Sequence, residues 1–272
     1  MFGISRQGFY QREKRQAHRL LQLEKVKALV VDQRNEMPRL GTRKIHYLIK
    51  SDLQHHHIKI GRDGLFDFLR SEHLLIRPRK SYTKTTWSKH WLRKYPNLLK
   101  EETVTRAEQV WVSDITYIAT KNGNTYLSLV TDAYSRKIVG HHLSDDLRTE
   151  GVAKALEMAI QNRKTSLPLI HHSDRGLQYC SEEYQTILSK GNIKPSMTDG
   201  YDCYQNALAE RMNGILKDEF IFATYNDQSQ LHKVLQQSIA IYNTKRPHLK
   251  LQYKTPTFIH EKSLTELTTR DS

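Results

Sequence analysis

The chain has 272 residues, of which 38% are apolar, and its 43 Lys and Arg against 29 Asp and Glu give a formal net charge of +14. Two cysteines are too few for a disulfide framework or a four-ligand zinc site, and no apolar run is long enough to predict a membrane span. The charge is one-sided, because residues 1–108 hold 24 Lys and Arg against 11 Asp and Glu, whereas residues 109–272 hold 19 against 18. We therefore expect the front of the chain to contact a polyanion. A basic surface that only keeps the protein in solution is the alternative.

The front of the chain is predicted to be helical. Residues 1–16 are polar and basic, and we expect an arm that becomes ordered on contact. Apolar residues at helical spacing predict helices over 17–35, 42–53 and 62–73, with Thr42 as the cap of the second. Helix, short turn and helix in a basic segment is typical of a helix-turn-helix DNA reader. An ordinary three-helix packing unit is the alternative.

A basic segment follows at 76–96, in which aromatic residues are interleaved with Lys and Arg. The aromatic residues are Tyr82, Trp87, Trp91 and Tyr95. Cations with aromatics suit contact with a nucleic-acid backbone combined with base stacking. A linker whose aromatics dock on the next domain explains the pattern equally well.

From about residue 108 the pattern changes to strands. The β-rich runs 109–119, 124–133 and 136–144 predict an antiparallel meander. The later elements, in chain order, are a helix over 149–163, a short strand ending at Asp174, a helix over 181–190, a short strand over 194–197 and helices over 205–222 and 227–243. This order predicts a mixed α/β domain. Residues 262–272 are polar, and we expect a frayed tail.

Two carboxylates lie in apolar, strand-like surroundings. Asp114 is in the middle of Val110–Ile118, and Asp174 ends the apolar run that begins after Pro168. A bare charge there is costly, and α/β sheets place their chemistry at strand ends. A divalent cation between two such carboxylates removes their repulsion. The alternative for Asp114 is a buried carboxylate satisfied by backbone donors.

Glu210 lies on a predicted helix with a polar stripe. On a helical wheel, Asn206, Asn213 and Lys217 lie on the same side as Glu210, and the apolar residues lie opposite. A stripe that simply faces solvent is the usual case, and a stripe that faces a metal site is the alternative. Three converging carboxylates suit two-metal phosphodiester chemistry. We therefore interpret the chain as a metal-dependent enzyme that cuts and joins DNA.

Composition alone does not exclude other acids. Asp132 ends the second predicted strand, where it could cap the turn or bind metal. The remaining candidates are Asp199, Asp202, Asp218 and Glu219.

At these residues the chain resembles a known family over nearly its whole length. The matching segments, in chain order, are Trp111-Val112-Ser113-Asp114-Ile115-Thr116-Tyr117, Ser135-Arg136-Lys137-Ile138-Val139-Gly140, His172-Ser173-Asp174-Arg175-Gly176-Leu177-Gln178-Tyr179, Ser196-Met197-Thr198, Asn206-Ala207-Leu208-Ala209-Glu210 and Tyr242-Asn243-Thr244-Lys245-Arg246-Pro247-His248, with Thr255-Pro256 downstream. Together they resemble the second-frame (OrfB-type) transposases of the insertion sequence 3 family, which belong to the DDE transposase and retroviral integrase superfamily. One departure is Gln205, where many relatives have Asp.

The resemblance implies an α/β fold, with an RNase H-like mixed five-stranded sheet and flanking helices, preceded by a small all-α helix-turn-helix domain. The implied segments are 1–75 (basic helical region), 76–107 (basic linker), 108–261 (catalytic core) and 262–272 (flexible tail). It implies that Asp114, Asp174 and Glu210 are the catalytic residues and that they hold two Mg²⁺ ions, for which Mn²⁺ can substitute. Water would first nick the element's end, and the freed 3′-hydroxyl would then attack target DNA.

The same resemblance suggests which side chains touch double-stranded DNA. We expect contacts from Arg43, Lys44, Arg62, Arg175, Gln178, Asn206 and Lys217. His172 is either a proton carrier or a packed structural histidine. For Arg246 and His248, packing against the catalytic helix is at least as good an explanation as DNA contact.

Family resemblance also implies a homo-oligomer on paired DNA ends, a possible fusion with an upstream frame product, and a cytoplasmic, nucleoid-associated location without membrane contact. Two other functions share these features. A non-catalytic DNA-binding regulator derived from a transposase would bind DNA without making product. A nuclease acting on RNA–DNA hybrids would cut without joining.

Overall fold

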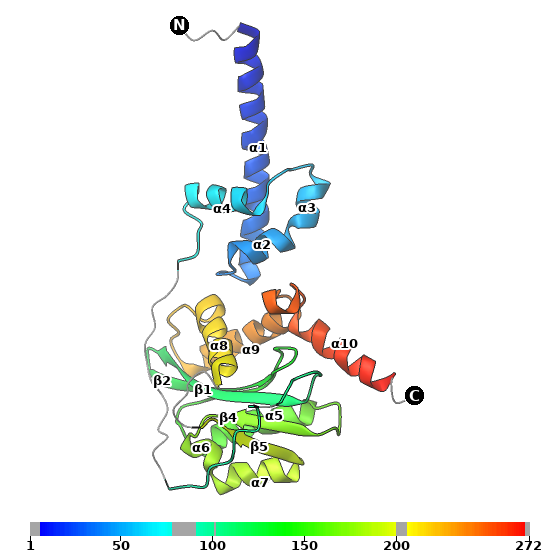
Figure 1. Ribbon diagram of the computed structural model, residues 1–272. Helices are drawn as coiled ribbons and strands as arrows, with labels where there is room; N and C mark the ends of the chain where they lie inside the picture. The colour runs from blue at the N-terminus through cyan, green and yellow to red at the C-terminus, as the bar shows by residue number, and fades with distance from the viewer. Residues whose placement is uncertain (1–5, 78–90, 101, 200–205, 270–272) are drawn as a thin grey trace. The chain divides into compact units, whose positions relative to one another are not determined.

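The computed structural model describes residues 6–77, 91–100, 102–199 and 206–269. It forms two compact units, Met1–Pro78 and Arg79–Ser272 (Figure 1), and each is considered by itself. Tyr82, Trp87, Asp202 and Gln205 lie outside the described residues. None of the helices within these ranges is both long and apolar enough to cross a membrane.

The first unit contains four helices: α1 (Arg6–Glu36), α2 (Thr42–Leu48), α3 (Lys50–His55) and α4 (Arg62–Ser71). Residues 6–16 of the expected arm are instead part of α1, which begins at Arg6. Its first turns have no apolar stripe, but Arg, Gln, Glu and Lys are good helix formers. The helix predicted over 42–53 is divided into α2 and α3 at Ile49.

A small core holds this unit together. Its fully buried side chains include Val26 and Val30 of α1, Ile45 of α2, and Leu65 and Leu69 of α4. Contacts between α2 and α4 close the unit. The arrangement of helix, turn and helix is therefore present over residues 42–71.

The second unit is built on a five-stranded sheet with the order β3-β2-β1-β4-β5. The strands are β1 (Val110–Thr120), β2 (Gly123–Asp132), β3 (Ile138–Ser144), β4 (Leu169–Ser173) and β5 (Ile193–Met197). The first three form the predicted antiparallel meander, and β4 and β5 are parallel to β1 and to each other. The predicted fold class is confirmed.

Helices cover both faces of this sheet (Figure 1). On one face, α5 (Thr149–Asn162), α6 (Leu177–Cys180) and α7 (Glu182–Lys190) pack on a core that includes Trp111 and Val130. On the other face, α8 (Ala207–Ile215) packs on β1, where Ala209 joins a cluster with Val110 and Val112. Neighbouring residues of β1 serve opposite faces because strand side chains alternate.

Close packing between β3 and α5 depends on Gly140. A Cβ at this position would lie 2.1 Å from the Ala155 carbonyl oxygen and 3.0 Å from the Ala159 Cβ. Neither atom is the end of a flexible side chain. Only glycine therefore fits between this strand and this helix.

One continuous helix was predicted over 205–222. The described residues of this segment instead form α8 followed by a second helical element. This second element, η2 (Leu216–Phe220), is a π-helix, a form that often marks functional sites. Glu219 of η2 forms a bidentate ion pair with Arg246, at 2.7 Å from Nε and 2.6 Å from Nη2. Arg246, which is 2% exposed, follows α9 (Gln228–Thr244). These contacts favour the structural interpretation of Arg246 over DNA contact.

The chain continues through η3 (Leu249–Leu251) into α10 (Pro256–Thr268). Thr255 caps α10 by accepting a hydrogen bond from the Phe258 N–H. Residues 262–268, expected to belong to a frayed tail, are helical. Ser263 is buried, and its hydroxyl accepts a hydrogen bond of 2.9 Å from the Ala107 N–H. A buried contact with the loop before β1 therefore secures this helix.

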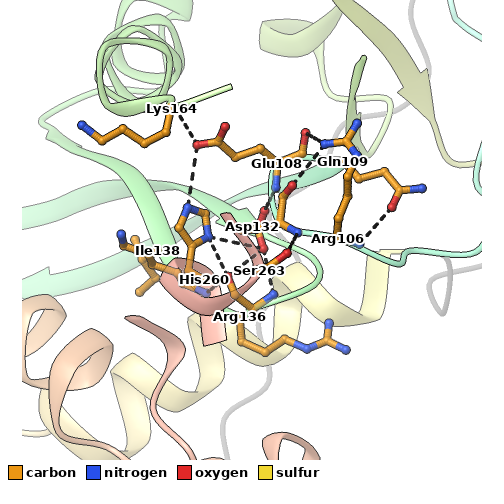
Figure 2. A network of polar contacts seen from close by, with 12 residues as sticks. Arg106, Glu108, Gln109, Asp132, Arg136, Ile138, Lys164, His260 and Ser263 are labelled. Atoms are coloured by element: carbon orange, nitrogen blue, oxygen red, sulfur yellow. Dashed lines mark hydrogen bonds and ion pairs between the residues drawn. The ribbon is translucent and has the colours of Figure 1, made fainter. Parts of the chain in front are cut away.

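A buried polar network joins α10 to the sheet (Figure 2). His260 lies between two buried carboxylates, with Nε2 3.7 Å from Glu108 Oε1 and Nδ1 3.8 Å from Asp132 Oδ1. Asp132 Oδ1 accepts hydrogen bonds from the Ser135 N–H and hydroxyl, each at 2.7 Å. Asp132 therefore caps the turn, which was one of its two open interpretations.

Candidate active site

Asp114 lies in the middle of β1, on the sheet face that α8 covers. It is partly buried, and its Oδ2 accepts a hydrogen bond of 2.8 Å from Asn213 Nδ2. The hydrogen bond ties the carboxylate to α8, one turn beyond Glu210. β1 therefore presents Asp114 to the helix that carries Glu210.

Asp174 immediately follows β4, which ends at Ser173. Because Val112 of β1 is paired with His172 of β4 in parallel register, Asp174 comes at the same level of the sheet as Asp114. The Gly176 N–H donates a hydrogen bond of 3.0 Å to Asp174 Oδ1. The tight turn after β4 therefore orients this carboxylate.

Polar residues before and after Glu210 on this helical segment contact β1. Asn206 Nδ2 donates to the Ser113 carbonyl at 3.2 Å, and Lys217 Nζ donates to Thr116 Oγ1 at 3.2 Å. With the bond from Asn213, these contacts follow β1 on both sides of Asp114. Glu210 itself is exposed, in the middle of a helix that is fixed above and below it.

Asp114, Asp174 and Glu210 influence one another's ionisation. Burial and the neighbouring charge of Asp174 raise the pKa of Asp114 to about 7, and Glu210 adds a smaller contribution in the same direction. Burial and Asp174 also raise the pKa of Glu210. Like charges that disfavour one another's ionisation are the condition a bound cation relieves.

The donor set suits a hard divalent cation. Its members are carboxylate oxygens, and the buried amide oxygens of Asn206 and Asn213 have no hydrogen-bond partner in the described part of the chain. Within the same residues, no three His, Cys, Asp or Glu side chains are gathered closely enough to enclose an ion as they stand. These residues therefore supply the oxygen ligands that a hard cation prefers, but in the described part of the chain they do not form a closed cage.

The histidines beside Asp174 belong to the core. His171 Nε2 lies 2.7 Å from Ser113 Oγ and 2.9 Å from the Tyr184 hydroxyl. Burial and the neighbouring His172 lower the pKa of His171 to about 3. His172 is 0% exposed, and its Nδ1 lies 2.8 Å from Ser196 Oγ. The geometry favours the structural interpretation of His172.

The predicted DNA contacts of the second unit lie around the carboxylates and make contacts within the protein. Arg175 Nε donates to the Thr198 carbonyl at 2.6 Å, and Gln178 Nε2 donates to the Leu147 carbonyl at 2.7 Å. Asn206 is buried. Lys217 Nζ also lies 4.8 Å from the centre of the Tyr117 ring. Their contact with DNA stays a prediction.

In the first unit, Arg43 and Arg62 both act on one acid. Hydrogen bonding and charge attraction from Arg62, with a smaller contribution from Arg43, lower the pKa of Asp63. Arg43 and Arg62 are exposed, and Lys44 is partly buried. The two arginines therefore lie on one side of the unit, which is compatible with the predicted DNA contact.

Within the second unit, residues 91–100 show both features left open for the basic segment. Tyr95 and Leu92 pack against the core of the second unit, and the Leu98 N–H donates to Ser196 Oγ at 3.0 Å. Trp91, in contrast, is 91% exposed.

Sequence reasoning placed Asn213 on the polar stripe but did not select it as a site residue. Its signal was its position, three residues after Glu210 on the same face of the helix. The Glu219–Arg246 pair had no local signal, because its members are 27 residues apart.

A mixed five-stranded sheet, helices on both faces, and carboxylates from β1, from the end of β4 and from a following helix together define an RNase H-like integrase core. Comparison with known families agrees. A family described as "Integrase core domain" matches residues 104–203, and a second family of the same description matches residues 191–256.

Curated relatives give the narrower family. The uncharacterized 31 kDa protein of insertion element IS600 from Shigella sonnei is 34% identical over 271 residues, covering 96% of this chain and 97% of that protein. Transposase InsF for insertion sequence IS3A from Escherichia coli K12 is 35% identical over 154 residues, which is 56% of this chain and 54% of InsF. The chain belongs to the insertion sequence 3 family of DDE transposases.

A solved structure shares the fold. A chain of the simian T-cell lymphotropic virus intasome, solved in complex with the PP2A regulatory subunit B56 gamma, superposes with a TM-score of 0.50 at 19% identity. The match covers 81% of this chain and 74% of that chain.

Proposed function

We propose that this chain catalyses divalent-metal-dependent cleavage of DNA and 3′-hydroxyl strand transfer, with Asp114, Asp174 and Glu210 as its catalytic carboxylates. The observation that carries the proposal is the raised pKa of Asp114, which burial and the nearby charges of Asp174 and Glu210 produce. Three acids far apart in sequence therefore influence one another at one place in the fold.

In this proposal the three carboxylates hold two Mg²⁺ ions, for which Mn²⁺ can substitute. Bound cations lower the pKa of the attacking hydroxyl and stabilise the leaving oxygen. The protein's own contribution is positioning: Asn213 holds Asp114, the Gly176 N–H holds Asp174, and the contacts of Asn206 and Lys217 hold the helix of Glu210.

The proposed substrate is double-stranded DNA, namely the ends of the element and a target. Arg43, Lys44 and Arg62 would contact it from the first unit, and Arg175, Gln178 and Lys217 from around the carboxylates. We propose a homo-oligomer on paired ends, a possible fusion with an upstream frame product, and action on nucleoid DNA in the cytoplasm.

A strand-transfer assay tests the proposal. Labelled DNA carrying an element end is incubated with the protein and Mg²⁺ or Mn²⁺, and cut and joined products are separated. Wild type is compared with Asp174→Asn and with a control of the same chemical change, Asp218→Asn, which removes an exposed acid from η2. Metal-dependent joining that Asp174→Asn abolishes and Asp218→Asn retains is the expected result.

Other outcomes would identify other functions. DNA binding without product in all three proteins would support the non-catalytic regulator. Cutting without joining would support a hydrolytic nuclease. Equal joining by wild type and Asp174→Asn would remove that carboxylate from the catalytic set.

A further inference from the structure

A groove lies beside the carboxylate site, on the face of the sheet that α8 covers. Its volume is about 720 Å³, within the range of pockets that take small organic ligands. Its apolar floor includes Val110 and Val112 of β1, Ala133 after β2 and Leu208 of α8. Val110, Val112 and Ala133 also belong to the buried cluster with Ala209 of α8.

The groove leads to the catalytic carboxylates. Val112 lies two residues before Asp114 on the same face of β1, and one strand step of two residues is about 7 Å. A DNA strand that passes the carboxylates and continues along β1 would therefore reach the groove after about two nucleotides.

Its rim is cationic. Of the described residues that line the groove, four are Lys or Arg and one, Glu102, is acidic. The cations are Arg136, Lys250, Lys254 and Lys262, and the three lysines are exposed. A rim of this charge is complementary to a polyanion.

An exposed aromatic ring completes the groove. Phe258 is 49% exposed, and Lys254 Nζ lies 5.3 Å from its ring centre. Aromatic and apolar surface beside cations is the combination that binds single-stranded nucleic acid, because bases stack on the ring while cations follow the backbone. An apolar floor does not bind a phosphate, but it accommodates an unpaired base.

We propose that this groove binds one or two unpaired nucleotides of the DNA strand adjoining the cleaved bond. Lys250 and Lys254 contact the phosphates, and Phe258 stacks with a base. This inference rests on the proposed function for its substrate, but its binding test is independent of catalysis.

The first arm measures DNA affinity against salt concentration in EDTA, by fluorescence anisotropy with a duplex that ends in a short single-stranded overhang. Each lost phosphate contact lowers the slope of log K against log salt by about 0.7–0.9. Lys250→Ala/Lys254→Ala is therefore expected to lower the slope by about 1.5. Lys250→Arg/Lys254→Arg should retain it, and so should the control Lys190→Ala/Lys194→Ala, two exposed lysines near β5.

The second arm tests stacking. Wild type is expected to prefer the overhang to a blunt duplex about tenfold, and Phe258→Ala to lose this preference. Leu249→Ala is the matched control, because Leu249 is also 49% exposed and does not line the groove.

An unchanged salt slope in the lysine variant, or an unchanged overhang preference in Phe258→Ala, would overturn the proposal. The proposal would also be overturned if an acidic peptide displaced overhang DNA equally well from wild type and from the lysine variant. Because no metal is present, a protein inactive in strand transfer can still pass both arms, which separates failure of this inference from failure of the proposed function.

Discussion

Replacing His260 tests whether the buried network holds the C-terminal helix to the core. Burial alone would raise the pKa of Glu108, but interaction with His260 and hydrogen bonds from the Lys164 and Thr165 N–H groups lower it to about 2 from 4.5. A shift of this size corresponds to about 3 kcal/mol. Removing one partner of a buried ion pair costs about 3–5 kcal/mol. We therefore expect His260→Gln to lower the free energy of unfolding by about 3 kcal/mol at pH 5.5.

The pH dependence gives a sharper test. Burial alone would lower the pKa of His260, but Asp132 and Glu108 outweigh it and raise that pKa above its ordinary value of 6.5. The stabilisation from His260 is therefore complete below pH 6.5 and is lost as the pH rises through the folded-state pKa. That from Glu108 is present above pH 4.5 and is lost as the pH falls toward 2.

Urea unfolding followed by the fluorescence of the buried Trp111 measures both effects. The gap between wild type and His260→Gln should be largest near pH 5.5 and should narrow at pH 8.5. His232→Gln, which changes an exposed histidine of α9, should match wild type throughout. A gap of equal size at both pH values would refute the ion-pair reasoning.

Three further changes have expected results. Because the pKa of Asp114 is raised to about 7, the metal-free protein loses stability as the pH rises from about 4 through 7. At pH 8 in EDTA, the free energy of unfolding of Asp114→Asn should therefore exceed that of wild type by about 2–4 kcal/mol, and a lower melting temperature than wild type would contradict this. Arg246→Ala removes the bidentate ion pair with Glu219 and should cost about 3–5 kcal/mol in urea unfolding, of which Arg246→Lys recovers only part because it lacks the bidentate fork. Gly140→Ala would force a Cβ to 2.1 Å from the Ala155 carbonyl oxygen and should cost at least about 1–3 kcal/mol; a thermal melt equal to wild type would contradict the packing.

Local patterns predicted most of the catalytic core. The runs 109–119 and 124–133 became β1 and β2, and the run 149–163 became α5, each within two residues. Alternation and helical periodicity are short-range signals, so these elements were readable. The division at Ile49 and the π-helix after Ile215 depend on tertiary packing, and no periodicity marks them.

For the site, the residues alone favoured Asp114 and Asp174, because each lies in an apolar strand context. Glu210 was different, since a helical polar stripe usually faces solvent. Only the family resemblance selected it before folding. In the structure, neighbours of Glu210 on the same helical segment contact β1 nearly a hundred residues away, as in the bond between Asn213 and Asp114, and the role of Glu210 itself stays a proposal. The network around His260 was missed for the same reason.

The placement of Asp114 within β1 also limits how this part of the gene can change in length. Because successive strand residues alternate between the two sheet faces, adding or deleting one codon between Val110 and Asp114 would move the carboxylate to the α5 side. Adding or deleting an even number of codons would keep the carboxylate on the same face of the sheet but would shift Asp114 along β1 relative to Asp174. The connections outside the strands carry no such parity rule, so they are where relatives of this chain are free to differ in length.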